Sequence, residues 1–141
     1  MKQIITLALV ALTLVTGLTE MSAQATYSKD QNNYFVLTRK VPQLKAILLA
    51  ADQLAKDDGE KFGEFHVVIC GETVKELTNL QAMQSYLDLA QSEKVKILAC
   101  GFSLKKFGVD ASAIPKEMSV VDNGILYGFN LQKDGFLSIT L

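Results

Sequence analysis

The chain has 141 residues, of which 49% are hydrophobic and 21% are charged, and its formal net charge is -1. This profile is typical of one compact globular domain rather than of a disordered segment. Lysines and acidic residues are mixed along the chain, so no basic stripe for phosphates is present and nucleic acid is not expected as a partner.

The first 25 residues differ in composition from the rest. A cationic start, MKQ, precedes the apolar run IITLALVALTLVTGL, and the segment ends in Ala23-Gln24-Ala25. This order is typical of a cleaved signal peptide. An uncleaved anchor is the alternative, but the run is shorter than the about 20 apolar residues that span a bilayer. We therefore predict a signal peptide at 1–25, a domain at 26–141, and export, with the periplasm of a Gram-negative bacterium as the expected location.

The remaining sequence alternates between strand and helix patterns. Runs of β-forming residues predict five strands, at 34–38, 64–70, 95–101, 119–121 and 136–141. Helical segments are expected in each interval between them, and Pro42 is placed to open the first. The second and third strands lack polar alternates, as strands covered on both faces do. The pattern predicts a single three-layer α/β/α domain with a five-stranded, mainly parallel sheet and no second domain.

Two cysteines, Cys70 and Cys100, stand at the carboxyl ends of predicted strands, where parallel sheets bind their ligands. A following helix N-terminus and the nearby Lys105 would favour a thiolate at Cys100. Cysteine is also a common small core residue, so position alone leaves both interpretations open for Cys100 and favours core filler for Cys70. A disulfide between the two is a further alternative, which requires that their strands be neighbours.

Other candidate residues give weaker signals. His66 is the only histidine and lies about 13 Å from Cys70 along an extended strand, so we interpret it as a partly buried structural residue. Arg39 and Lys40 follow the first strand and are candidates for binding an anionic sulfur species, although such pairs are more often solvated. No zinc-ligand spacing and no phosphate-binding glycine motif is present, so neither a metal nor a cofactor is predicted.

Large apolar residues in the last third of the chain have two interpretations. They belong either to the core or to a subunit interface, and we expect the core for most of them: Phe102, Phe107, Tyr127 and Phe129.

The carboxyl-terminal third of the chain contains the run VKILACGFSLKKFGVDASAIPKEMSVVDNGILYGFNLQKDGFLSITL. It resembles the DsrE/DsrF-like family, in which a strand ends at a cysteine, a short helix ends in glycine, and a V..NG…LQ..G segment leads into the last strand. The likeness covers about residues 33–141. It implies a flavodoxin-like fold, a homo-oligomer of two, three or six chains, and a role in sulfur relay, with Cys100 carrying a persulfide between donor and acceptor proteins.

Two features depart from that family. Its well-characterised relay members are cytoplasmic, whereas this chain is predicted to be exported, and Cys70 is not part of the core signature. The leading hypothesis is an exported sulfur carrier or sulfurtransferase that uses Cys100. The alternative is a noncatalytic oligomeric binding module, in which Cys70 and Cys100 are structural or joined as a disulfide.

Overall fold

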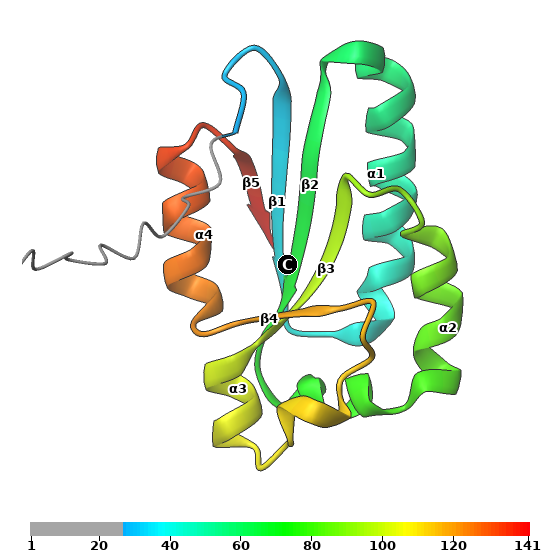
Figure 1. The fold of residues 1–141 in the computed structure, drawn as a ribbon, viewed down its shortest axis with the longest axis vertical. Helices are drawn as coiled ribbons and strands as arrows, with labels where there is room; N and C mark the ends of the chain where they lie inside the picture. The colour runs from blue at the N-terminus through cyan, green and yellow to red at the C-terminus, as the bar shows by residue number, and fades with distance from the viewer. Residues whose placement is uncertain (1–26) are drawn as a thin grey trace, which may run out of the picture.

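The computed structural model describes residues 27–141, so the predicted signal peptide lies outside the described residues. The described part contains one five-stranded sheet in the order β4-β3-β2-β1-β5, and every neighbouring pair is parallel (Figure 1). Its strands are β1 (Asn32–Thr38), β2 (Phe62–Ile69), β3 (Val95–Cys100), β4 (Ser119–Val121) and β5 (Leu137–Thr140). The predicted α/β fold with five strands is confirmed.

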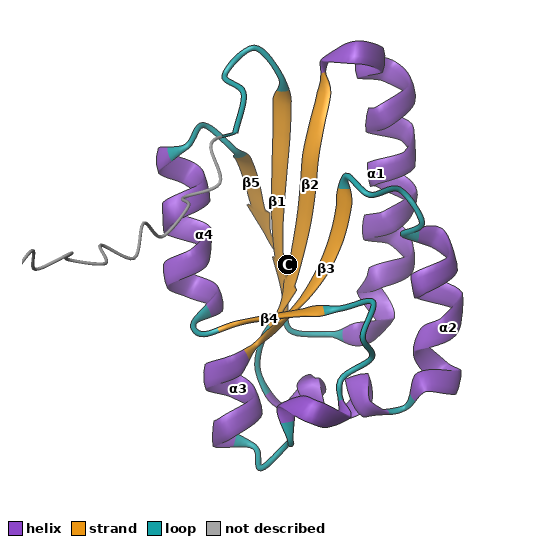
Figure 2. Cartoon of the chain, in the orientation of Figure 1, coloured by secondary structure: helices purple, strands orange, loops and turns teal. Residues whose placement is uncertain are grey.

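Helices alternate with the strands along the described chain, as Figure 2 shows. They are α1 (Leu44–Asp58), α2 (Leu80–Leu89), α3 (Gly101–Lys106) and α4 (Gly124–Lys133). Short 3-10 helices occur at Val41–Gln43, Glu72–Thr78 and three-residue turns elsewhere. No helix within residues 27–141 has the length and apolar content that crossing a bilayer would require.

The chain path explains why helices cover both faces of the sheet. From β1 to β4 the strands are added one after another in one direction, and α1 and α2 pack together on one face (Figure 1). The chain then returns past β1 to add β5 at the opposite edge. A right-handed connection in the reverse direction places α4 on the other face. Helix α3 follows β3 directly and lies beyond the carboxyl end of the sheet.

The core is divided by the sheet into two clusters of buried side chains. Alternate residues of β2 belong to opposite clusters: Val67 and Ile69 pack on the α1 side, whereas Val68 and the following Cys70 pack on the α4 side. Both alternations are apolar because both faces are covered, which explains the missing polar positions in this strand. Cys100 joins Cys70 in the α4-side cluster.

Two of the aromatic residues expected in the core are at the surface. Phe102 is 63% exposed and Phe129 is 58% exposed, so the core interpretation is wrong for both. They lie on the outer sides of α3 and α4, which no other described element covers. Phe107 and Tyr127 are half-buried.

Candidate thiol site

The two cysteines lie side by side at the carboxyl ends of neighbouring strands. The last registered pair of β2 and β3 is Ile69 and Ala99, so the next positions in the same register are Cys70 and Cys100. The N–H of Cys70 donates to the carbonyl of Thr38 across 2.9 Å, which keeps this residue in the extended ladder. Both thiols are free and buried. The strand order that a Cys70–Cys100 disulfide requires is therefore present, although no disulfide is formed.

The N-terminus of α4 covers this cysteine pair. Asn123 caps the helix by accepting a hydrogen bond from the N–H of Ile125 at 3.0 Å. The N–H of Gly124 donates instead to the sulfur of Cys100, at 3.3 Å. A Cβ atom at Gly124 would lie 2.7 Å from the sulfur of Cys70. Only glycine lets the helix approach so closely, because a side chain here would overlap the thiol.

Ser103, in α3, contacts the site from the other side. It is 6% exposed, and its hydroxyl accepts a hydrogen bond from the N–H of Gly71 at 2.9 Å. This bond ties the loop after β2 to α3. Ser103 therefore fixes the distance between the segments that follow the two cysteines.

The environment separates the two thiols by pKa. Burial opposes ionisation of Cys100, but hydrogen bonds from the Ser103 side chain and from backbone N–H groups, including that of Gly124, outweigh it and lower the pKa of Cys100. For Cys70, burial and then the neighbouring Cys100 raise the pKa to about 12. The pair therefore consists of a thiol that ionises readily beside one that keeps its proton.

Arg39 brings positive charge to the same edge of the sheet. Its Nε lies 3.3 Å from the position that a Cβ would take at Gly71, the residue after Cys70. Its charge acts on Cys70 in the direction opposite to burial. Arg39 also lines a hollow of about 510 Å³, whose other lining residues are Lys40, Pro42, Glu72, Thr73, Lys75 and Glu76. The hollow carries both signs of charge, and Lys75 and Glu72 are paired at 2.8 Å.

Lys105 is on the exposed last turn of α3, at the end of the helix away from Cys100. The groups that lower the pKa of Cys100 most are Ser103 and Gly124, which the sequence analysis did not single out. The Asn-Gly pair at 123–124 is a helix-start signal and was the one sequence cue to Gly124.

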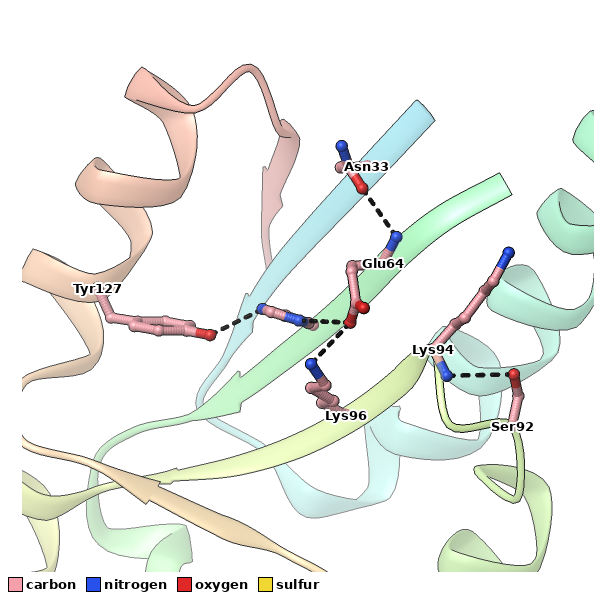
Figure 3. Close-up of polar contacts among 7 residues, drawn as sticks. Asn33, Glu64, Ser92, Lys94, Lys96 and Tyr127 are labelled. Carbon is pink, nitrogen blue, oxygen red and sulfur yellow. Dashed lines mark hydrogen bonds and ion pairs between the residues drawn. The ribbon is translucent and has the colours of Figure 1, made fainter. Parts of the chain in front are cut away.

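His66 belongs to a separate polar chain that links α4 to the sheet. Its Nδ1 lies 2.8 Å from the hydroxyl of Tyr127, and its Nε2 lies 3.2 Å from a carboxylate oxygen of Glu64. Lys96 donates to the same oxygen at 2.8 Å, so the chain runs from Tyr127 on α4 to the surface of β3 (Figure 3). Burial lowers the pKa of His66 and favours its neutral form. This arrangement fits a buried structural histidine.

Among residues 27–141, no cluster of three His, Cys, Asp or Glu side chains could hold a metal ion.

Comparison with known proteins shows the fold. No protein-family model matches the chain, and no curated protein matches it. A solved structure that is similar is the protein of unknown function MTH1491 from Methanobacterium thermoautotrophicum, 19% identical, with a TM-score of 0.64 over 79% of this chain and 100% of that chain. Another is the conserved protein of unknown function BT1422 from Bacteroides thetaiotaomicron, 22% identical, with a TM-score of 0.59 over 81% of this chain and 99% of that chain. The likeness establishes a flavodoxin-like, three-layer α/β domain.

Proposed function

We propose that this protein is an exported sulfur carrier or sulfurtransferase, in which Cys100 accepts a sulfane sulfur atom and passes it on as a persulfide. The observation that carries the proposal is the hydrogen bond from the Gly124 N–H to the Cys100 sulfur, at a thiol whose pKa is lowered. Thiolates, not thiols, attack sulfane sulfur, so this environment suits a nucleophile. The resemblance to the DsrE/DsrF-like family at the same cysteine supports the same role.

The transfer is a displacement at sulfur. The Cys100 thiolate attacks the terminal sulfur of a donor persulfide, R–S–SH, and a new sulfur–sulfur bond forms on Cys100 while the donor leaves as R–S⁻. An acceptor thiolate then attacks the outer sulfur, and the Cys100 thiolate is regenerated. No net oxidation occurs in either step. Arg39 and Lys40 are suited to attracting the anionic donor to this edge of the sheet.

Single-cysteine variants test the assignment to Cys100. The reduced proteins C70S and C100S are treated with glutathione persulfide, quenched with an alkylating agent, and weighed by intact-mass spectrometry. We expect C70S to gain one sulfur atom that reductant removes, and C100S to gain none. Equal uptake by both variants, or no uptake by either, would contradict the proposal.

The predicted export is tested on the same protein recovered from cells. We expect a chain that begins near Thr26 and is found in the periplasmic fraction, because the small residues Ala23 and Ala25 form the cleavage signal. A full-length chain in the cytosol would contradict export and leave the chemistry of Cys100 to be judged separately.

The alternative function is a noncatalytic binding module with structural cysteines. The deep burial of the thiols favours it, since Cys100 is 3% exposed and Cys70 is 9% exposed. In that case C100S would lower the free energy of unfolding, and neither single-cysteine variant would take up sulfur.

A further inference from the structure

The second cysteine has a place in the chemistry that the proposed function does not use. Cys70 and Cys100 occupy facing positions on neighbouring parallel strands, and both side chains are on the α4 face. Neighbouring strands are about 4.8 Å apart, which is inside the range of Cα separations that disulfides span. A bond between these two sulfurs therefore needs no rearrangement of the sheet.

The two thiols also differ in the way that a nucleophile and a resolving thiol do. Hydrogen bonds from Ser103 and Gly124 favour the ionised form of Cys100. Cys70 keeps its proton, since burial and the nearby Cys100 both raise its pKa. The ionised Cys100 is thus the sulfur that reacts first with an external donor, and Cys70 holds a proton in reserve beside it.

The surroundings keep the pair close together and place positive charge beside it. The closely packed Gly124 backbone contacts both cysteines, because a Cβ there would lie 2.7 Å from the Cys70 sulfur and 3.4 Å from the Cys100 Cβ. Arg39 acts electrostatically on Cys70 from the loop side. A small anion released at this point leaves next to a guanidinium group.

We infer that Cys70 is a resolving thiol, which attacks the persulfide on Cys100, releases its outer sulfur as hydrogen sulfide anion, and leaves a Cys70–Cys100 disulfide. This inference rests on the proposed function. The Cys70 sulfur bonds to the inner sulfur of Cys100 while the bond from that inner sulfur to the terminal sulfur breaks. The Cys70 proton passes to the terminal sulfur, which leaves as HS⁻. The sulfane sulfur is reduced to sulfide and the two cysteines are oxidised, so atoms and electrons balance.

A dithiol reductant completes the cycle. It reduces the Cys70–Cys100 disulfide to two thiols and becomes a disulfide itself. The overall activity is the reduction of a sulfane sulfur atom to sulfide, with a dithiol as the source of electrons.

The test compares the purified wild-type chain with C70S and C70A after treatment with one equivalent of glutathione persulfide. Sulfide is trapped and quantified over time, and the alkylated proteins are digested and weighed. We expect the wild type to release about one equivalent of sulfide and to yield a peptide pair joined through Cys70 and Cys100. Both variants should retain the extra sulfur on Cys100 and release sulfide about tenfold more slowly or less, because they lack a thiol held in position.

Each other outcome overturns the inference. If wild type and C70S both keep a stable Cys100 persulfide, Cys70 does not resolve it, although the proposed sulfur transfer stands. If C70S and C70A release sulfide as fast as the wild type, the release does not need Cys70. If no protein takes up sulfur, the proposed function fails and this inference with it. Unfolding curves of C70S and C70A show whether either variant is folded, and the folded one is used.

Discussion

The N–H of Gly124 and the sulfur of Cys100 are 24 residues apart in the chain and 3.3 Å apart in space. The contact exists because α4 carries the chain from β4 back to β5 across the face on which Cys100 lies. A backbone donor at the start of a ten-residue helix is therefore held against a strand-end thiol by the topology of the sheet.

The first prediction concerns the pH dependence of alkylation. Cys100 should react with iodoacetamide at lower pH than an ordinary thiol, since hydrogen bonds lower its pKa, whereas Cys70 should remain unreactive until about pH 12. The measurement is the rate of labelling at each cysteine against pH, read by peptide mapping. In denaturant the two profiles should coincide. Parallel profiles in the folded protein would show that the site does not separate the thiols.

The second prediction concerns the close approach of α4. A Cβ at residue 124 would lie 2.7 Å from both the Cys70 sulfur and a methyl group of Val68. We expect G124A to lower the free energy of unfolding by about 1–3 kcal/mol and to raise the pKa of Cys100 as the helix N-terminus moves away.

Gly128 provides a matched control on the same helix. Its Cβ would lie 2.6 Å from the Phe35 ring, so G128A also overpacks α4 against the sheet but does so away from the thiols. Both variants should be less stable, and only G124A should shift the alkylation profile of Cys100. An equal shift in both would mean that the helix as a whole, rather than the Gly124 N–H, sets the reactivity.

The sequence predicted the elements better than it predicted the site. Apolar runs located all five strands, because burial on both faces leaves a local pattern. The neighbouring positions of Cys70 and Cys100 depend on strand order, which no local pattern encodes. The same holds for Ser103, whose bond to Gly71 spans 32 residues. Lys105 was a plausible partner by proximity in sequence, but the turn of a short helix carries it away from Cys100.

The third prediction concerns self-association, which the resemblance to the DsrE/DsrF-like family implies. Helix α4 exposes Ile125, Leu126 and Phe129 at 61%, 58% and 58% of their surfaces. Exposed apolar side chains gathered on one helix are typical of interfaces, and we expect a second copy of this chain to cover them. Light scattering after size exclusion should give a homo-oligomer for the wild type and a smaller species for F129E. A monomeric wild type would contradict this, and K133E, a charge change on the same helix, serves as the control.

The fourth prediction concerns acid stability through His66. Burial lowers the pKa of His66 in the folded protein from its ordinary value of 6.5. Below that value the unfolded chain therefore binds a proton more readily than the folded one does, and the free energy of unfolding should fall as pH decreases from about 6.5. The groups that face the ring are Glu64, Tyr127, Tyr27 and Phe136.

Glu64 titrates in a lower range, because Lys96 and His66 overcome the effect of its burial and lower its pKa from 4.5. The interval between about pH 7 and about pH 5 therefore reports mainly on His66. Urea unfolding across this interval should show a slope in the wild type and a flatter line in H66Q, whatever the offset between the two proteins. If the slope persists unchanged in H66Q, the loss of stability in acid originates elsewhere, and the His66–Tyr127 bond that joins β2 to α4 is not its cause.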